Sequence, residues 1–438
     1  MIKIISLTSG LAVALVLFSK VAFEMSYDKF YPDADRLYRI QRKIYNLKED
    51  KVGYDGPKIN APLPNALKTE LSEIEASTVI FISPAEDFFQ IEDKIFGEKV
   101  VTADTGFFDL FGIALIEGDK RKLDVDANVF LSQSAAYRFF GTTSPVGKTI
   151  LKGSAPLTVA GVFEDLPANS HLSFHVLTSL PASRMPGWNQ ADAFMGYVKL
   201  APGVAAEEVE AKIPDILPLY YDVKGKAERG DRDEYFLNPV ATLHTGETAV
   251  KRVILTLSIF AFSLLFIAAM NYVLISISSL ARRAISVSIH KCNGASGRDI
   301  FGMLLSETAA FVCLALLFAA VLILAFRQSV EAIIQTPLSA VFSFANLWAA
   351  PVVIICLMLF AGIIPAYIFS SVPVTHLIQS YSTNKRVWKH TLLFVQFATI
   401  SFIFALLVII IKQYNLLVNH DPGYTVENMV YSDNTRYV

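Results

Sequence analysis

The chain has 438 residues, of which 53% are hydrophobic and 18% are charged. A soluble domain carries roughly 25% charged residues, so this composition excludes an ordinary soluble globular protein. The formal net charge of −2 provides no basic surface for nucleic acid, and no nucleic-acid partner is expected.

Residues 1–23 form the first apolar stretch, and they predict a transmembrane helix. A hydrocarbon core of ~30 Å needs about 20 apolar residues in a helix. Lys20 interrupts the stretch near its end, where a lysine can snorkel to the headgroups. A cleaved signal peptide is the alternative, because Lys3 precedes the apolar run. No small-x-small cleavage site follows the run, so a retained helix is favoured.

Residues 24–251 have the polarity of a globular domain. Leu37 to Tyr45 alternates apolar and polar residues, which predicts a strand. Ser132 to Phe140 predicts a helix that Ser132 caps and Gly141 ends. We also expect strands over Leu157 to Phe163 and Tyr197 to Leu200, and a helix over Glu207 to Leu217. This mixture predicts an α+β domain. It joins the membrane helices without a Gly/Ser linker, so it is suited to receive their movement.

Four more apolar stretches predict transmembrane helices, at residues 252–281, 300–326, 347–372 and 391–412. The segments between them differ in charge. Residues 282–299 contain four Lys or Arg against one acid, and residues 373–390 contain three Lys or Arg and no acid. The positive-inside rule places both segments in the cytoplasm. Residues 24–251 and the tail at 413–438 then lie outside, and the amino terminus lies inside.

Two sequence patterns in the outer domain are similar to ligand-binding motifs. The run from Gly141 to Lys148 is similar to a Walker A loop, but five residues instead of four separate its glycines, and one of them is Pro145. A turn between a helix and a strand is favoured. His171 and His175 are four residues apart and could share a metal ion on a helix. No acidic third ligand lies nearby, so a structural turn is favoured.

The sequence contains no Ser/His/Asp set and no paired carboxylates at useful spacing, so no catalytic residue is predicted. The three cysteines, at positions 292, 313 and 356, have no zinc-ligand spacing, and none lies in the outer domain. No metal-binding or cofactor-binding residue is predicted. Glu307 lies inside an apolar helix, where it is either a functional acid or a packing contact. A proton-driven carrier is disfavoured because membrane acids are few, and Gly362 with Pro365 is the only sign of a broken helix.

Several motifs, taken in order, cover nearly the whole chain. They are Glu24-Met25-Ser26-Tyr27-Asp28-Lys29-Phe30, Asp35-Arg36-Leu37-Tyr38-Arg39-Ile40, Phe139-Phe140-Gly141 with Pro145-Val146-Gly147-Lys148, Gly161-Val162-Phe163 with Pro167-Ala168-Asn169-Ser170-His171-Leu172, Asn271-Tyr272, Arg282-Arg283, Lys291-Cys292-Asn293-Gly294-Ala295-Ser296, Glu307 and Ala361-Gly362-Ile363-Ile364-Pro365-Ala366. Together they resemble the FtsX-like permease family with a MacB-type periplasmic core domain.

The resemblance implies a non-catalytic membrane subunit of an ABC transporter of the mechanotransmission type, in a bacterial inner (cell) membrane. A separate cytoplasmic ATPase would bind ATP and Mg²⁺ and dock on residues 282–299. The coupling residues implied are Arg282, Arg283, Ile289, Lys291, Gly294, Ala295 and Ser296. The pattern from Ile285 to Ile289 fits a strand as well as a helix, so the helix rests on the resemblance. A homodimer or a pseudo-dimer with a second permease unit is implied, and a periplasmic adaptor is a further implied partner.

Two departures from the family pattern weaken this expectation. The family commonly has an acid where Ser286 stands and a glycine where Ser288 stands, so the segment implied to face the ATPase lacks one charge of the family pattern. Residues 413–438 look like the start of a second periplasmic unit, which suggests a fragment or truncated product. The alternative function is a membrane scaffold or sensor that regulates a periplasmic or cell-wall partner without transport.

Overall fold

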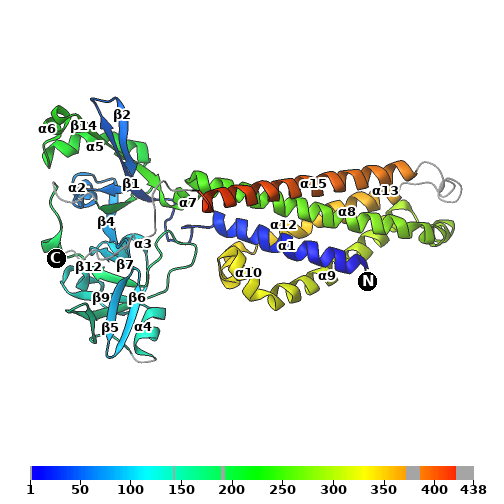
Figure 1. The fold of residues 1–438 in the computed structure, drawn as a ribbon, viewed down its shortest axis with the longest axis horizontal. Coiled ribbons are helices and arrows are strands. Elements are labelled where there is room, and N and C mark those ends of the chain that lie inside the picture. The colour runs from blue at the N-terminus through cyan, green and yellow to red at the C-terminus, as the bar shows by residue number, and fades with distance from the viewer. Residues whose placement is uncertain (1, 142–143, 189–192, 371–384, 421–438) are drawn as a thin grey trace. The chain divides into compact units, whose positions relative to one another are not determined.

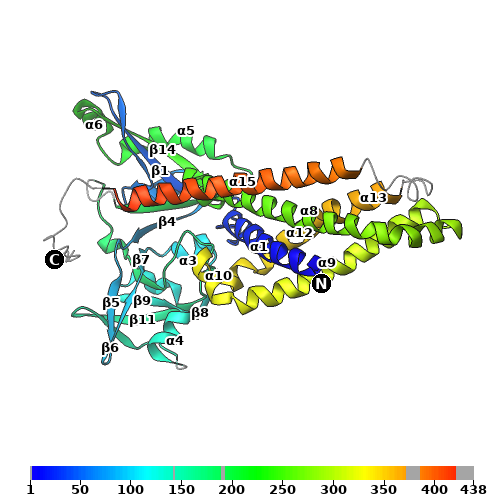
Figure 2. The ribbon, with the colours of Figure 1, turned by 45° about the vertical axis from the view of Figure 1, so that its right-hand side comes forward.

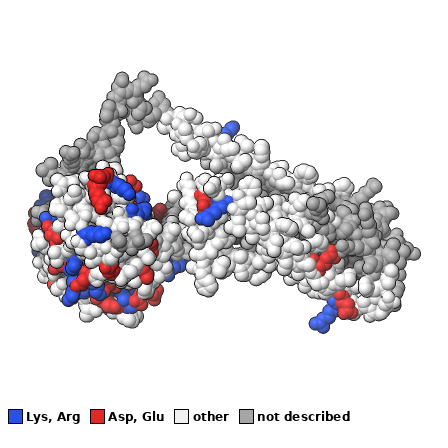
Figure 3. Space-filling view, turned by 90° about the horizontal axis from the view of Figure 1, so that it is seen from below, with Lys and Arg blue, Asp and Glu red and all other residues white. Residues whose placement is uncertain are grey.

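The computed structural model describes residues 2–141, 144–188, 193–370 and 385–420 (Figure 1). The chain divides into two compact units. The outer unit comprises Ser19–Thr256 and Gln328–Leu347, and the helical unit comprises Met1–Phe18, Leu257–Arg327 and Trp348–Val438. Charged side chains cover the surface of the outer unit, whereas the visible face of the helical unit is almost free of them (Figure 3).

In its described residues, the outer unit has one mixed sheet of 14 strands. Its strands are β1 (Leu37–Asn46), β2 (Lys51–Gly56), β3 (Lys58–Ile59), β4 (Ile74–Ile82), β5 (Asp87–Ile91), β6 (Lys94–Glu98), β7 (Val100–Ala103), β8 (Leu115–Gly118), β9 (Asn128–Ser132), β10 (Thr149–Lys152), β11 (Ala155–Phe163), β12 (Val176–Ser179), β13 (Phe194–Leu200) and β14 (Asp231–Pro239). Eleven of them follow one another in the order β14-β1-β13-β4-β7-β12-β9-β11-β10-β5-β6, and β2, β3 and β8 pair from the side with β1, β13 and β11 respectively. The β9–β11 and β7–β12 pairs are parallel, and neighbours such as β1 and β14 are antiparallel.

Short helices complete the outer unit and confirm the predicted α+β class. They are α2 (Leu63–Glu70), α3 (Phe107–Phe111), α4 (Gln133–Phe140), α5 (Ala206–Ile216), α6 (Val223–Arg229) and α7 (Leu243–Gly246), together with α10 (Arg327–Ile334) and α11 (Leu338–Val341). The predicted cap of α4 is confirmed, because the Ser132 hydroxyl accepts a hydrogen bond from the Ala135 amide and Gly141 ends the helix at a φ of 76°. The predicted strands over β1, β11 and β13 and the predicted helix α5 are confirmed as well.

The outer unit has several apolar clusters. One is rich in aromatic side chains, with Phe107, Phe111, Phe130 and Phe163 all fully buried. A second cluster packs α2 and α5 against β1, β13 and β14, and a third packs α4 against β9 and β11. Burial of this much apolar surface stabilises the domain without disulfides.

Among the residues that the structure describes, five helices are long and apolar enough to cross a membrane, at Ile4–Met25, Thr248–Ser276, Gly297–Ala325, Phe344–Tyr367 and Leu393–Val418. The first four lie in α1 (Ile2–Met25), α8 (Thr248–Cys292), α9 (Gly297–Ala325) and the pair α12 (Ala349–Leu357) and α13 (Ile364–Ser370), which a π-helical turn at Met358–Ile363 joins. The fifth lies in α15 (Lys385–Val418).

Small residues bring these helices close together within the helical unit. Gly10 of α1 faces Ala268 of α8, where an added Cβ would lie 2.5 Å from the Ala268 Cβ. The two helices lie side by side in both ribbon views (Figures 1 and 2). The Tyr272 hydroxyl donates to Thr308 Oγ1 at 3.1 Å and joins α8 to α9. Gln396 Nε2 donates to Asn271 Oδ1 at 3.2 Å and joins α15 to α8. Small residues and buried polar contacts are what hold helices together in lipid.

Candidate functional site

The segment that follows α1 is bound tightly to a distant turn of the outer domain. Asp28 is fully buried and has a φ of 59°. Its amide donates to the Asn169 carbonyl at 2.9 Å, and its Oδ1 accepts from the His171 amide at 2.9 Å. The Asn169 side-chain amide donates to the Ser26 carbonyl at 2.9 Å. Two motifs about 140 positions apart in the sequence therefore contact each other directly.

Side chains extend this contact into the aromatic core. His171 Nδ1 lies 2.8 Å from Asp28 Oδ1, and its Nε2 lies 3.0 Å from the Tyr197 hydroxyl. The Tyr31 and Ser170 hydroxyls are 2.9 Å apart. Burial raises the pKa of both tyrosines, so they remain protonated and able to donate. We call this set the latch: Ser26, Asp28, Tyr31, Asn169, Ser170, His171 and Tyr197.

A second polar cluster surrounds the last turns of α1. Glu24 Oε1 lies 2.6 Å from Lys20 Nζ, and Glu24 Oε2 lies 2.6 Å from His244 Nε2 of α7. The ring of His244 is stacked on Tyr27, with centroids 3.6 Å apart. Lys20 also donates to Thr336 Oγ1 at 2.7 Å, in the segment between α10 and α11. We call these five residues the junction cluster.

The latch and the junction cluster fix the end of α1 to three other parts of the outer unit. A neutral hydrogen bond contributes about 1 kcal/mol and a charged one about 1.5–3 kcal/mol. A displacement of this end of α1 must therefore move the residues bound to it, unless several such contacts break together. These contacts therefore join the end of α1 mechanically to the Asn169–His171 turn, to α7 and to the segment between α10 and α11.

The predicted coupling residues lie at a helix end and the turn that follows it. Helix α8 continues to Cys292, so the stretch around Ser286 is helical and not a strand. Arg282, Arg283 and Lys291 belong to α8, and their side chains lie outside the described part of the structure. Ile289 is 55% exposed.

The end of α8 has the geometry of a Schellman cap. Gly294 has a φ of 92°, and the Ala295 amide donates to the His290 carbonyl at 3.0 Å. Ser296 then caps α9 through a reciprocal capping box with Asp299. Gly294, Ala295 and Ser296 thus form a defined turn between two helices. Their binding of an ATPase stays a prediction.

Glu307 is half-buried on α9 and precedes Thr308, whose hydroxyl accepts a hydrogen bond from Tyr272. Its functional role likewise stays a prediction.

The structure places a Ser/His/Asp group together that the sequence did not indicate. Ser132 Oγ lies 3.1 Å from His175 Nδ1, and Ser134 Oγ lies 3.5 Å from the same nitrogen and donates to Asp165 at 2.7 Å. A hydrolytic triad needs serine and aspartate on opposite ring nitrogens. Here the serines and Asp165 all approach the same ring nitrogen, and Asp165 Oδ1 lies 4.0 Å from His175 Nδ1. Ser132 and Ser134 both belong to the start of α4. The group is a helix cap.

The two sequence patterns that are similar to ligand-binding motifs have structural roles. His171 belongs to the latch and His175 to the α4 cap, and no group of three possible metal ligands occurs among the described residues. The stretch resembling a Walker A loop joins α4 to β10, where the Gly147 amide donates to the Val159 carbonyl at 2.8 Å; residues 142 and 143 lie outside the described residues.

Comparison with known proteins identifies both parts of the chain. Residues 1–216 match the family model of the MacB-like periplasmic core domain, and residues 258–374 match the FtsX-like permease C-terminal model. A macrolide export ATP-binding/permease protein MacB from Aggregatibacter actinomycetemcomitans is 26% identical over 219 residues, which are 48% of this chain and 32% of that protein. MacB from Chromobacterium violaceum is 26% identical over 224 residues, or 49% and 33%. The matched region thus spans about a third of these relatives.

Among solved structures, a domain assigned as a permease from Porphyromonas gingivalis is 26% identical, with a TM-score of 0.43 over 48% of this chain and 91% of that one.

Proposed function

Since the chain belongs to the MacB-like family of ABC-transporter permeases, we propose that it is the membrane subunit through which a separate cytoplasmic ATPase drives movement of the outer unit. ATP and Mg²⁺ would be bound by that partner. The curated relatives are named as macrolide exporters with an ATP-binding part. For this chain we propose export or periplasmic handling of a lipophilic or peptidic substrate, in a bacterial inner membrane.

The latch is the observation that carries this proposal. A helix end that only tethers a domain needs no buried carboxylate in a left-handed conformation, which costs free energy to maintain. The latch instead binds α1 to the turn at Asn169–His171 through backbone and side-chain hydrogen bonds at once. This construction supports transmission of a pull or a rotation from α1.

We propose a second permease unit as a further partner, either another copy of the chain or a related half. The span in α15 supports this, because only 6% of its apolar window is buried within the described structure. Aromatic side chains such as Phe394, Phe397 and Phe404 are exposed along it. Lipid covers such a helix when it is alone, and a neighbouring bundle covers it in an assembly.

The test is purification of the tagged chain from its native membranes in mild detergent, followed by mass spectrometry of the proteins that accompany it. Recovery of a P-loop ATPase supports the permease function. If periplasmic or cell-wall proteins accompany the chain and no ATPase does, the coupling function is wrong and the chain is a scaffold or sensor.

A further inference from the structure

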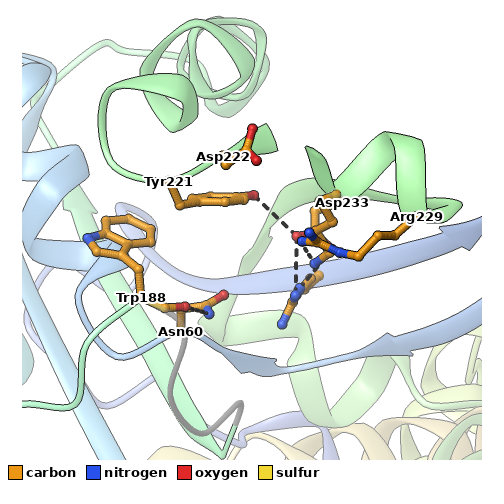
Figure 4. Close-up of a pocket in the computed structure, with 8 residues that line it drawn as sticks. Asn60, Trp188, Tyr221, Asp222, Arg229 and Asp233 are labelled. Carbon is orange, nitrogen blue, oxygen red and sulfur yellow. Dashed lines mark hydrogen bonds and ion pairs between the residues drawn. The ribbon is translucent and has the colours of Figure 1, made fainter. Parts of the chain in front are cut away.

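A pocket of about 430 Å³ lies in the outer unit beside α6, and none of its lining residues belongs to the latch. Its lining includes Arg42 of β1, Asp233 of β14, and Lys226 and Arg229 of α6. Asp233 and Arg229 lie together on one side of the pocket (Figure 4). Figure 4 shows Trp188 and Asn60 on the opposite side, with the Tyr221 ring between the two walls. The pocket is large enough for a small organic molecule.

The aromatic side of the pocket is held in place before any ligand arrives. Trp188 is stacked on Tyr220 and Tyr221, with centroids 5.2 and 5.6 Å apart and ring planes within 26°. Asn60 Nδ2 donates to the Trp188 carbonyl at 2.6 Å. A fixed, flat aromatic surface favours a ligand with a flat ring, because offset stacking contributes beyond the area it buries.

Asp233 is fully engaged and is not available to a ligand. Its carboxylate and the Arg42 guanidinium are each only 3% exposed and are joined by two hydrogen bonds, of 3.1 and 3.2 Å. The same carboxylate also accepts from the Tyr221 hydroxyl at 3.2 Å and from Lys226 Nζ at 2.5 Å. Four donors thus converge on one acid, and the nearby Tyr221 hydroxyl has a raised pKa because of burial and this negative charge.

The pocket is left with one uncompensated positive charge. Its lining contains the cations Arg42, Lys226 and Arg229 against the acids Asp222 and Asp233. Asp222 caps α6 by accepting from the Gly225 amide at 2.8 Å. Within the described part of the chain, Arg229 has no hydrogen-bond or ion-pair partner, and its side chain is exposed at the pocket. A guanidinium binds a carboxylate through two parallel hydrogen bonds.

We propose that this pocket binds a small aromatic carboxylate, with its ring against Trp188 and Tyr221 and its carboxylate on Arg229 and Lys226. Trp188 and Arg229 lie on opposite sides of the pocket, so a ligand needs both a flat ring and a carboxylate to use the whole of it. Binding involves only the outer unit and requires neither nucleotide nor the ATPase. This proposal can therefore fail while the coupling function stands, and the reverse also holds.

The test is ¹⁹F NMR of the full chain in lipid nanodiscs, with 4-fluorobenzoate as the probe and neutral 4-fluorobenzamide for comparison. We expect saturable line broadening of the benzoate, and affinity for the amide lower by about tenfold or more, since a charged hydrogen bond is missing. Arg229→Gln should weaken benzoate binding by a similar factor of about ten. The matched control is Arg232→Gln, which neutralises an exposed arginine of β14 that pairs with Glu234 outside the pocket.

A pair of variants at Trp188 separates stacking from folding. Trp188→Phe keeps a flat ring and should retain benzoate binding, whereas Trp188→Leu should lose it while the thermal unfolding of the two variants stays alike. Three results would overturn the proposal: no saturable binding of benzoate, equal binding of benzoate and benzamide, or equal affinity of the Arg229→Gln and Arg232→Gln proteins.

Discussion

Asp28 combines a left-handed backbone, full burial and hydrogen bonds to both the amide and the ring of His171. Asparagine and aspartate tolerate this conformation better than other residues with a Cβ. Asp28→Ala should lower the free energy of unfolding of the outer unit by about 3 kcal/mol, because it removes these hydrogen bonds and strains the backbone. Asp28→Asn keeps an oxygen acceptor and should cost about 1 kcal/mol.

Thermal unfolding of the full chain, followed by circular dichroism in its β-sheet signal, measures this difference. Asp35→Ala is the control, because Asp35 is an exposed acid of the same segment. If Asp28→Ala unfolded at the same temperature as Asp35→Ala, the latch would not contribute to the stability of the domain.

Glu24 joins Lys20 and His244, and the exchange Glu24→Gln removes the charge while it keeps the size of the side chain. Removing a charged hydrogen bond weakens the junction by about 1.5–3 kcal/mol. We expect the ATPase to copurify as before, while the nucleotide-dependent change in protease sensitivity of the outer unit is strongly reduced. Lys29→Gln, at an exposed position nearby, should leave that change intact. A normal response in Glu24→Gln would remove the junction cluster from the transmission path.

At the scale of elements, the turn between α8 and α9 requires a residue that can adopt a positive φ. Gly294 has a φ of 92°, where a β-branched residue is strained by roughly 1–2 kcal/mol. Gly294→Val should therefore shift the end of α8 and weaken ATPase association several-fold, measured by copurification. Gly294→Asn tolerates the same φ and is the matched control. Equal ATPase recovery in the two variants would show that this turn is not part of the docking surface.

The packing of α1 on α8 depends on the absence of a side chain at Gly10. A Cβ there would lie 2.5 Å from the Ala268 Cβ, so Gly10→Leu should separate the two helices. We expect lower thermal stability in detergent, by about 1–3 kcal/mol as for other overpacked contacts. Gly302 of α9 has open space around its position, so Gly302→Leu is the control with the same change of size. Equal stability of the two variants would contradict close packing at Gly10.

Local signals were enough to predict several elements of the outer unit. Each of these signals lies within a single element. They are the alternation of apolar and polar residues in β1, the serine cap and terminal glycine of α4, and the lengths of the apolar stretches. The order of the sheet could not be predicted in this way, because β1 pairs with β13 about 160 residues later. Such pairing depends on the whole chain and has no local signature.

The same limit applies to the candidate sites. The motifs of the family resemblance include Asp28 and the Asn169–His171 turn as separate segments, and only the fold brings the His171 amide within 2.9 Å of Asp28 Oδ1. Trp188, Tyr221 and Asp233 carried no signal at all, since a pocket forms where unconnected segments meet. The alternating residues around Ser286 fit a strand or a helix equally well, and the structure shows that they belong to helix α8. A long continuous helix overrides a short strand-like pattern.

At the scale of the whole molecule, the charge of each connecting segment predicts which side of the membrane it faces. The basic residues of 282–299 and 373–390 predict that both are cytoplasmic. Cys292 lies in the first of these segments and the sequence has only two other cysteines, Cys313 and Cys356, both within candidate spans. Replacing those two with alanine leaves Cys292 as a single reporter of topology.

We expect a membrane-impermeant maleimide to label Cys292 only after spheroplasts are opened. The control is Ser154→Cys in a protein without other cysteines, because Ser154 is exposed in the turn between β10 and β11. This position should be labelled in intact spheroplasts, which shows that the reagent reaches the outer unit. Labelling of Cys292 in intact spheroplasts would reverse the orientation and place the α8–α9 turn beyond the reach of a cytoplasmic ATPase, so coupling through Gly294 would be physically impossible.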